Sequence, residues 1–377
     1  MATYRAFLYD TSPASSGGFG PSTLLAEFEK VKNVGWERHL NEVGTAFFTI
    51  NQDDPKLSGL RPYKGKAHVR ITRDNEVVFG GIWGGLSANG EDAIFYAYGY
   101  EALLYSLPTD WNTRWQDAQI DTIVTDLWTR AKTTLTWSPL GFVTTGTIQA
   151  PVTTSGGATA IVLPLYRTYN KRILFCIREL VALGTSDLTN TVYFELLPAT
   201  SPTSTTVTFN FWKNRSTDQT DVKWEYPNGL VRDFNDDQEP ILARNDIVSV
   251  GSSPNDILLR QEVDHAGGTY GYETIGRRME PLYFAWVRDE DELTRVSALR
   301  LARALRPEPD LRLNMNANSV KPPGVTGAGY TLGDRVRVKV KRGITDIDQY
   351  MFLSGVQVLF LRGQEHVQPW LMDRSGS

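Results

Sequence analysis

The segment Tyr330–Val358, YTLGDRVRVKVKRGITDIDQYMFLSGVQV, decides the fold because an earlier part of the chain repeats its pattern. Val336, Val338 and Val340 alternate with charged residues, and this period of two is typical of a strand with one buried face. A charged turn follows, and a second apolar stretch returns through Phe352–Val358. The segment therefore predicts a β-hairpin.

The earlier copy is His68–Leu86, HVRITRDNEVVFGGIWGGL. Val69 and Ile71 begin the first predicted strand, Asp74-Asn75 forms the polar turn, and a second apolar run follows. Two similar hairpins at opposite ends of one chain predict two copies of one small β-barrel, separated by inserted material. A trimer of such a chain would present six similar units, which could dock on a six-fold ring.

The expected fold is β-rich α+β, with two similar small β-barrels of the tube type and an inserted α/β domain. A chain of 377 residues is too long for one ordinary core, which agrees with several domains. The expected divisions are 1–107 for the first β-barrel, 108–220 for the inserted α+β domain, 221–310 for a β-rich segment with a helix that contributes partly to the second barrel, and 311–377 for the segment that closes the second barrel.

Three amphipathic helices are predicted. Residues 117–132 and 170–183 carry apolar residues at helical spacing, and both belong to the inserted domain. Residues 289–305 form the clearest helix, because acidic residues open it where the helix dipole favours negative charge. Its apolar stripe, which includes Leu299, is expected to be buried against a barrel.

The composition is that of an ordinary globular protein, with 41% hydrophobic and 22% charged residues. A net charge of −4 gives no reason to expect a protein that binds nucleic acid with its whole surface. No apolar run reaches the roughly 18–20 residues of a membrane-spanning helix, and the N-terminus does not resemble a signal peptide. Cys176 is the only cysteine, so no intrachain disulfide can form, and the chain is compatible with a reducing cytosol.

Residues with catalytic potential are scattered. The four histidines, His39, His68, His265 and His366, lie far apart and form no metal-binding or catalytic pattern. An aspartate beside His265 could make an acid/base pair, but a histidine in a loop is the preferred interpretation. Cys176 falls near the apolar face of a predicted helix and is interpreted as a core residue. The chain is therefore expected to be no enzyme and to need no cofactor.

The densest acidic cluster outside a helix start is formed by Asp233, Asp236, Asp237 and Glu239. Carboxylates could hold Ca²⁺, but the spacing of a calcium-binding loop is absent. A solvated loop or a patch that faces a pore is preferred, so no metal ligand is predicted.

A row of four basic residues, Arg335, Arg337, Lys339 and Lys341, would share one strand face. Such a row could contact DNA, but four like charges on an exposed face more often mark solvated surface or a subunit interface. These four residues and Leu299 are the candidate interface residues.

Four tryptophans lie close together in the sequence: Trp111, Trp115, Trp128 and Trp137. They could form a sugar-binding platform, but packing in a core or an interface is the preferred interpretation.

The segments Tyr330–Val358 and GYETIGRRMEPLYFAWVRDEDELTRVSALRLARAL resemble the tail-associated hub proteins at the tips of tailed-phage tails, the family of the T4 central hub. In that family a Gly-Arg step, here Gly276-Arg277, precedes a helix of this kind, and a final Leu-Gly-Asp hairpin closes the second barrel. The N-terminal segments NEVGTAFFTINQDDP and VRITRDNEVVFGGIW are similar to the first barrel. The resemblance is weakest over 110–220.

This resemblance implies a homotrimer that closes the tail tube beneath the ring of the distal tail protein. It also implies contacts with the tape measure protein and with tail fibres or receptor-binding proteins, and passage of DNA through the ring at ejection. The protein would be part of the virion, at the tail tip, after assembly in the host cytoplasm.

Two alternatives stay open at this point. A distal tail ring protein with a carbohydrate-binding insertion would have one barrel, and therefore no structural match between 68–86 and 336–358. A glycan hydrolase would turn over cell-wall material.

Overall fold

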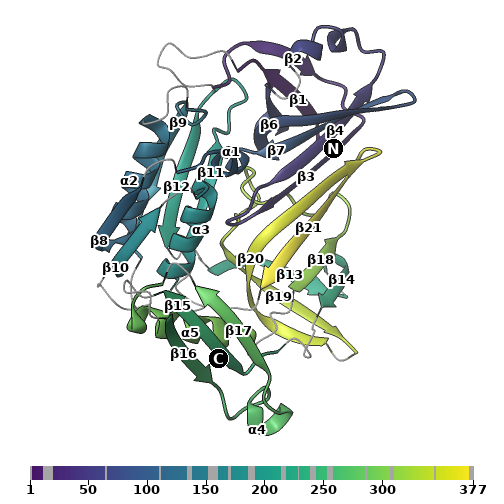
Figure 1. Ribbon diagram of the computed structural model, residues 1–377. Coiled ribbons are helices and arrows are strands. Elements are labelled where there is room, and N and C mark those ends of the chain that lie inside the picture. The colour runs from purple at the N-terminus through teal and green to yellow at the C-terminus, as the bar shows by residue number, and fades with distance from the viewer. Residues whose placement is uncertain are drawn as a thin grey trace.

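The computed structural model describes residues 2–11, 20–63, 66–109, 112–133, 138–151, 160–168, 171–185, 192–213, 218–227, 229–237, 243–252, 258–284, 287–305, 310–343 and 345–372. Figure 1 shows a large sheet on the right, an inserted region on the left and a smaller region below. The regions alternate along the chain, because both ends of the chain contribute to the large sheet.

Within the described residues, the large sheet has 13 strands. Its N-terminal half contains β1 (Tyr4–Tyr9), β2 (Leu24–Phe28), β3 (Asn33–His39), β4 (Thr45–Asn51), β5 (His68–Arg73), β6 (Glu76–Asn89) and β7 (Asp92–Gly99), with short 3-10 helices at Pro55–Leu57 and Arg61–Tyr63. Its C-terminal half contains β13 (Asp218–Tyr226), β14 (Val231–Asp237), β18 (Asp310–Met315), β19 (Arg335–Arg342), β20 (Thr345–Leu361) and β21 (Gln364–Met372). The halves meet where β3 pairs antiparallel with β20.

The two halves repeat one order of hydrogen-bonded strands. The order is β3-β4-β7-β6-β5-β1 in the N-terminal half and β14-β18-β21-β20-β19-β13 in the C-terminal half. The two predicted hairpins, β5–β6 and β19–β20, occupy equivalent places, and Val336, Val338 and Val340 of β19 are fully buried. The outermost pairs differ, since β1 is antiparallel to β5 whereas β13 is parallel to β19.

The long strands β6 and β20 match in detail. Each pairs with its hairpin partner along its first part and with the next strand, β7 or β21, along its second part. At the changeover each strand has a bulge, which ends at Gly85 in β6 and at Gly355 in β20. The bulge in β20 requires glycine, because a Cβ on Gly355 would lie 2.1 Å from the ring of His39. Gly85 and Gly355 are therefore equivalent positions.

A single hydrophobic core extends through both halves of the large sheet and includes Phe48, Phe95, Val338 and Val358. In the described part of the chain none of the sheets closes into a barrel, so the expectation of two separate small barrels is not confirmed. In the N-terminal half, the edge of β3 that a closed barrel would need is used instead to pair with β20.

The inserted region follows β7. It contains α1 (Glu101–Ser106), β8 (Thr113–Gln119), α2 (Ile120–Thr133), β9 (Val143–Ile148), β10 (Val162–Thr168), α3 (Ile173–Gly184), β11 (Val192–Pro198) and β12 (Val207–Lys213). The strands form two small sheets, β10-β8 and β11-β12-β9. The helices predicted at 117–132 and 170–183 are present as α2 and α3, and their apolar faces share one core.

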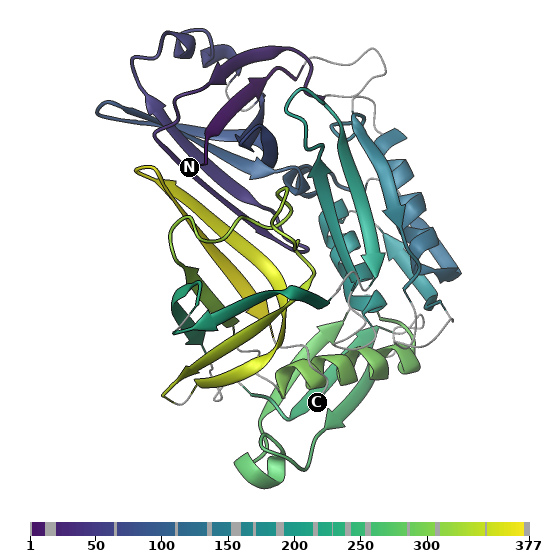
Figure 2. The ribbon, with the colours of Figure 1, turned by 180° about the vertical axis from the view of Figure 1, so that it is seen from behind.

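The smaller region lies between β14 and β18 in the sequence. It contains β15 (Asp246–Ser252), β16 (Leu258–Asp264), α4 (Tyr272–Ile275), β17 (Met279–Phe284) and α5 (Glu290–Ala304), and its sheet has the order β16-β15-β17. Figure 2 shows α5 in front of this sheet, and α5 packs on β15 and β16. The expectation that its apolar stripe packs against a barrel is wrong, because helical periodicity predicts a buried face without saying what covers it.

A buried ion pair connects the two halves of the large sheet. Glu365, at the start of β21, accepts from Arg73 Nε at 2.7 Å and from Arg73 Nη2 at 2.9 Å. Tyr4 of β1 donates its hydroxyl to Glu365 Oε1 at 2.5 Å. Because Glu365 is 2% exposed, its charge depends on these donors for compensation.

Arg73→Met is expected to lower the free energy of unfolding by about 3–5 kcal/mol, because it leaves the Glu365 carboxylate buried without its cation. Urea unfolding at constant m-value measures the change. Adding Glu365→Met should recover part of the loss, since an apolar pair carries no desolvation penalty, but the buried Tyr4 hydroxyl then loses its acceptor.

The less buried pair Arg5–Glu27, whose side chains are 38% and 29% exposed and whose nitrogen and oxygen lie 3.2 Å apart, is the matched control. Arg5→Met should cost less than about 1 kcal/mol. Equal losses for Arg5→Met and Arg73→Met would contradict the role assigned to burial.

Candidate functional site

The four predicted basic residues lie on β19, on the face opposite its buried valines. Each has a carboxylate near it on β13 or β20. The closest distances are 2.6 Å for Arg335 Nε–Asp218 Oδ1, 3.1 Å for Arg337 Nη2–Asp348 Oδ1, 4.0 Å for Lys339 Nζ–Asp348 Oδ2 and 3.0 Å for Lys341 Nζ–Asp346 Oδ2. The surface is therefore a ladder of ion pairs across three strands, which we call the charge ladder, and each exposed pair contributes about 0–1 kcal/mol.

The acidic half of the charge ladder was not predicted from the sequence. A signal was present, because Asp346 and Asp348 alternate with Ile347 on the return strand. Residues i and i+2 on one strand share a face, so these aspartates had to face the basic row across the hairpin.

The equivalent face of the first hairpin is covered. Arg70 on β5 is equivalent to Arg337 on β19. Arg70 pairs with Gly80, five residues before the bulge glycine Gly85, and Arg337 pairs with Tyr350, five residues before the bulge glycine Gly355. Arg70 is 0% exposed, and its Nη1 donates to the carbonyl oxygen of Pro202 in the inserted region at 3.3 Å. The inserted region therefore buries this face of β5, whereas the equivalent face of β19, which carries the charge ladder, lies at the surface.

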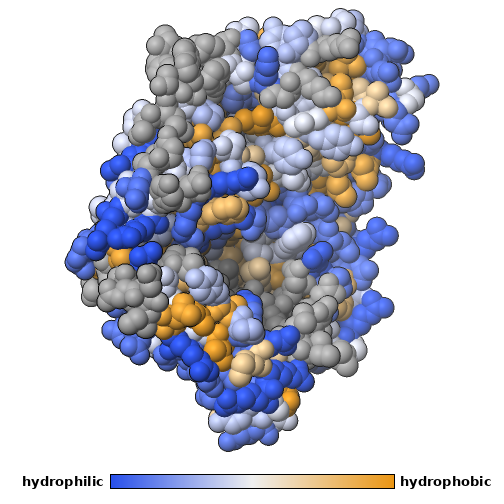
Figure 3. All heavy atoms as spheres, in the orientation of Figure 1, coloured by the Kyte–Doolittle hydropathy of each residue, from blue (hydrophilic) through white to orange (hydrophobic). Residues whose placement is uncertain are grey.

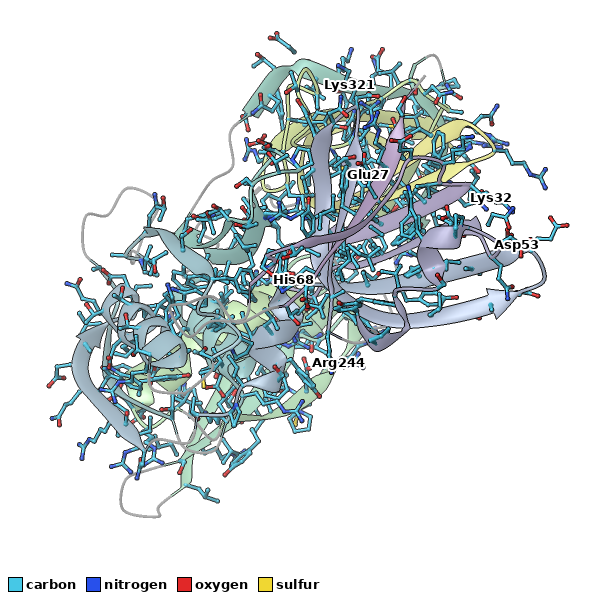
Figure 4. The ribbon with its side chains drawn as sticks, turned by 90° about the horizontal axis from the view of Figure 1, so that it is seen from above. Glu27, Lys32, Asp53, His68, Arg244 and Lys321 are labelled. Carbon is cyan, nitrogen blue, oxygen red and sulfur yellow. The ribbon has the colours of Figure 1, made fainter. Side chains whose placement is uncertain are left out.

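His68 lies beside Arg70 under the same cover. Its ring packs on those of Tyr100 and Phe142, with centroids 5.6 Å and 5.1 Å away. Burial, reinforced by the positive charge of Arg70, lowers the pKa of His68 to about 3. Figure 4 shows His68 at the junction of the large sheet and the inserted region. His68 is therefore a neutral packing residue.

Leu299 lies on α5 and is buried. The helix begins at Asp289, whose side chain accepts from the backbone N–H groups of Asp291 and Glu292. Leu293 and Val296 of the same stripe join the core of the inserted region. As a buried residue of the smaller region, Leu299 supports that region's fold, and its place in an interface stays a prediction.

The acidic cluster at 233–239 falls mainly on β14, and Glu239 lies outside the described residues. Asp233 and Asp236 lie on the strand, where Thr345 donates its hydroxyl to Asp236 Oδ2 at 2.8 Å. Within the described ranges, no group of three or more His, Cys, Asp or Glu side chains is arranged to hold a metal ion.

The other residues with catalytic potential are dispersed. Cys176 is fully buried in α3, and burial raises the pKa of its thiol to about 12. His39 Nε2 lies 2.5 Å from Glu37 Oε1. His366 lines a cavity of about 300 Å³ beside β14 and β18. Of the four tryptophans, Trp115 and Trp128 are buried in the core of the inserted region. Trp111 and Trp137 lie outside the described residues.

An exposed apolar patch covers the face of the smaller sheet opposite α5. It is formed by Leu258, Met279 and Tyr283, which are 65%, 51% and 66% exposed. Figure 3 shows hydrophobic atoms gathered over this sheet. Large apolar side chains clustered at the surface are typical of a contact with another protein. No helix in the described part of the chain is long and apolar enough to cross a membrane.

Comparisons with known proteins identify the fold. No family model and no curated protein matches the chain. The structure is similar to the tail protein from Neisseria meningitidis, with a TM-score of 0.65 over 98% of this chain and 97% of that chain at 11% identity. It is also similar to the 43 kDa tail protein of prophage MuSo2 from Shewanella oneidensis, with a TM-score of 0.63 over 98% of both chains at 10% identity.

A third similar structure is an E. coli component of the type VI secretion system, described as similar to the T4 bacteriophage tail proteins gp27 and gp5. It matches with a TM-score of 0.52 over 92% of this chain and 75% of that chain at 10% identity. The chain therefore has the fold of phage tail and baseplate hub proteins. A distal tail ring protein with a single copy would lack the match between 68–86 and 336–358, and that match is present.

Glu292, at the start of α5, generates a pH prediction. Burial raises its pKa from 4.5 to about 7. Because the folded pKa lies above the unfolded one, the stability linked to Glu292 is complete below pH 4.5 and is lost as the pH rises through 7. Glu292→Gln should therefore unfold at the same temperature as the unmodified chain near pH 4.5 and become more stable at pH 8. At about 1.4 kcal/mol per pKa unit, the gain is at most about 3 kcal/mol.

Thermal unfolding of both proteins from pH 4.5 to 8 measures this difference. Glu290→Gln, two residues earlier at an exposed site, is the control and should show no such pH dependence. If the unfolding temperatures of Glu292→Gln and the unmodified chain change in parallel with pH, the raised pKa assigned to the buried Glu292 carboxyl group is ruled out.

Proposed function

We propose that this protein is the hub of a phage tail tip, in which three copies form a ring that ends the tail tube and docks on the ring of the distal tail protein. The observation that carries the proposal is the duplicated strand order of the large sheet. Three chains with two similar units each present six units, which is the number that a six-fold ring requires. The fold of phage tail proteins supports the same role.

The other expected partners are the tape measure protein and the tail fibres or receptor-binding proteins. The apolar patch formed by Leu258, Met279 and Tyr283 supports a protein contact outside the large sheet. In this role the protein acts by geometry, as an adaptor and a conduit, and has no turnover.

The ring would also let DNA pass at ejection. Each phosphate that a Lys or Arg neutralises adds salt-dependent affinity and would retard DNA, so a channel should avoid a basic lining. We expect the charge ladder to face solvent or neighbouring copies, while acidic and neutral side chains line the channel. Each basic residue of the charge ladder also has an aspartate beside it, which reduces its attraction for phosphate.

The assembled protein is expected to have three times the 42.2 kDa mass of one chain. Native mass spectrometry across a range of concentrations, together with mass measurement of rings from virions, tests this. A monomer at every concentration, with no ring in virions, would contradict the proposal.

Reversing charge in the ladder, with Arg337→Glu and Lys339→Glu together, should impair ring assembly more than DNA ejection. Both new carboxylates would face Asp348, and like charges on opposite strands cost about 0.2–1 kcal/mol each. Ring yield by sedimentation and ejection rate by dye release are the two readouts.

A matched variant adds Asp348→Lys, which restores opposite charges within the chain but not toward a neighbouring copy. Continued failure to assemble in this variant would place the row at a subunit contact. Particles that assemble normally but release DNA at an altered rate would show instead that the row lines the channel.

A further inference from the structure

The strands β18 and β21 share a ladder that stops early. Their pairs are Leu311–Leu371 and Arg312–Trp370, although both strands extend beyond the second pair. In the same register the next β21 residue would be Pro369, which has no N–H group to donate. Because β18 continues its pairing with β14, and β21 with β20, the two strands leave a gap inside the sheet.

The far end of this gap is closed by Asn318, in the loop after β18. Its backbone N–H donates to the carbonyl oxygen of Glu365 at 2.8 Å, and its side-chain Oδ1 accepts from the Glu365 N–H at 3.0 Å. Between the two closed ends, Gln368 of β21 donates from Nε2 to Oδ1 of Asn314 on β18 at 2.8 Å. The width of the gap is therefore set by contacts at both ends and across its middle.

A cavity of about 300 Å³ lies at this gap. Pockets for small molecules have volumes of about 300–1,000 Å³, so this cavity suits a ligand of one ring. Leu359, Met315 and Val367 supply apolar walls, and the last two are buried core residues. The other lining side chains are polar, and they are Arg232, Asp233, Asn314, Gln357, His366 and Gln368.

Four of the polar side chains form one row across the strands, which we call the amide row: Gln357, Gln368, Asn314 and Asp233. Gln357 pairs with Gln368 in the β20–β21 ladder, and Asn314 pairs with Asp233 in the β18–β14 ladder. Gln357 Nε2 donates to Glu37 Oε2 at 3.2 Å, which fixes one end of the row. Within the described residues, the Asn314 amide keeps both its N–H groups, and the amides of Gln357 and Gln368 keep their carbonyl oxygens. The amide row thus presents donors and acceptors side by side.

These features favour a neutral ligand with several hydroxyl groups. The formal charges of Arg232 and Asp233 cancel, and both side chains are exposed, so a phosphate or carboxylate would find no buried cation in the lining. A hydroxyl group both donates and accepts, so neighbouring hydroxyls match a row of amide N–H groups and oxygens. A sugar ring combines such hydroxyls with C–H groups that can contact apolar walls.

We propose that this cavity binds one neutral sugar unit, with its hydroxyl groups on the amide row and its C–H groups against Leu359 and Met315. The proposal goes beyond the hub role, because the cavity is formed within one chain and needs neither a second copy nor DNA. The sugar site and the ring can therefore fail independently.

Methyl NMR of the full chain tests the proposal at one residue. The chain has five methionines, whose ε-methyl groups give separate signals, and Met315→Leu identifies the signal of Met315. The probes are the methyl glycosides of glucose, galactose, mannose and N-acetylglucosamine. At least one should shift the Met315 signal until it saturates, whereas Met279, exposed on the smaller sheet, should not respond. Glucuronate and glucosamine, which carry charges, should bind more weakly than the neutral glycosides.

Gln368→Met removes the centre of the amide row at similar side-chain volume. It should weaken sugar binding about fivefold to tenfold, which is the effect of losing one or two neutral hydrogen bonds. Gln364→Met is the matched control, because Gln364 lies on the same strand at an exposed position and does not line the cavity. This control should bind the sugar as the unmodified chain does.

No shift of Met315 with any of the four glycosides, or equal shifts of Met315 and Met279, would overturn the sugar site. Both results come from the unmodified chain and do not depend on a variant folding. Equal binding of the charged sugars, or a folded Gln368→Met variant that binds as tightly as the unmodified chain, would also overturn it. The hub proposal would still stand, because the mass of the ring is measured without sugar.

Discussion

The antiparallel pairing of β3 with β20 is the constraint on which the rest of the structure depends. It joins residues 33–39 to 355–361, and therefore brings both ends of the chain into one sheet and one core. The buried Arg73–Glu365 ion pair and the Tyr4 hydroxyl connect the same two halves. Without the β3–β20 pairing each half would have an additional unpaired edge, and the inserted segments would be held only by their own small cores.

The two halves share an order of strands but differ in what surrounds them. The inserted region covers the first hairpin, so Arg70 and His68 are buried, whereas the second hairpin displays the charge ladder. A ring built from this chain would therefore be nearly six-fold where the large sheets meet and three-fold where the inserted regions lie. Such a change of symmetry is what an adaptor between a six-fold tube and a three-fold tip requires.

Local patterns in the sequence predicted the local elements. The alternation of Val336, Val338 and Val340 predicted β19, and apolar spacing predicted α2, α3 and α5. The β3–β20 joint could not be predicted, because strand pairing between distant segments depends on tertiary packing and leaves no periodic signal. For the same reason Arg70 and Arg337, which have similar neighbours in sequence, gave no indication that only one would be buried.

Electron microscopy of the purified ring, viewed along its axis, tests the central claim most directly. The account predicts a closed ring in axial projection. Its strongest rotational symmetry component should be six-fold near the channel and three-fold at the periphery, where the inserted regions lie. A ring with another rotational order, or six-fold symmetry that extends to the periphery, would contradict the claim that three duplicated chains build the hub.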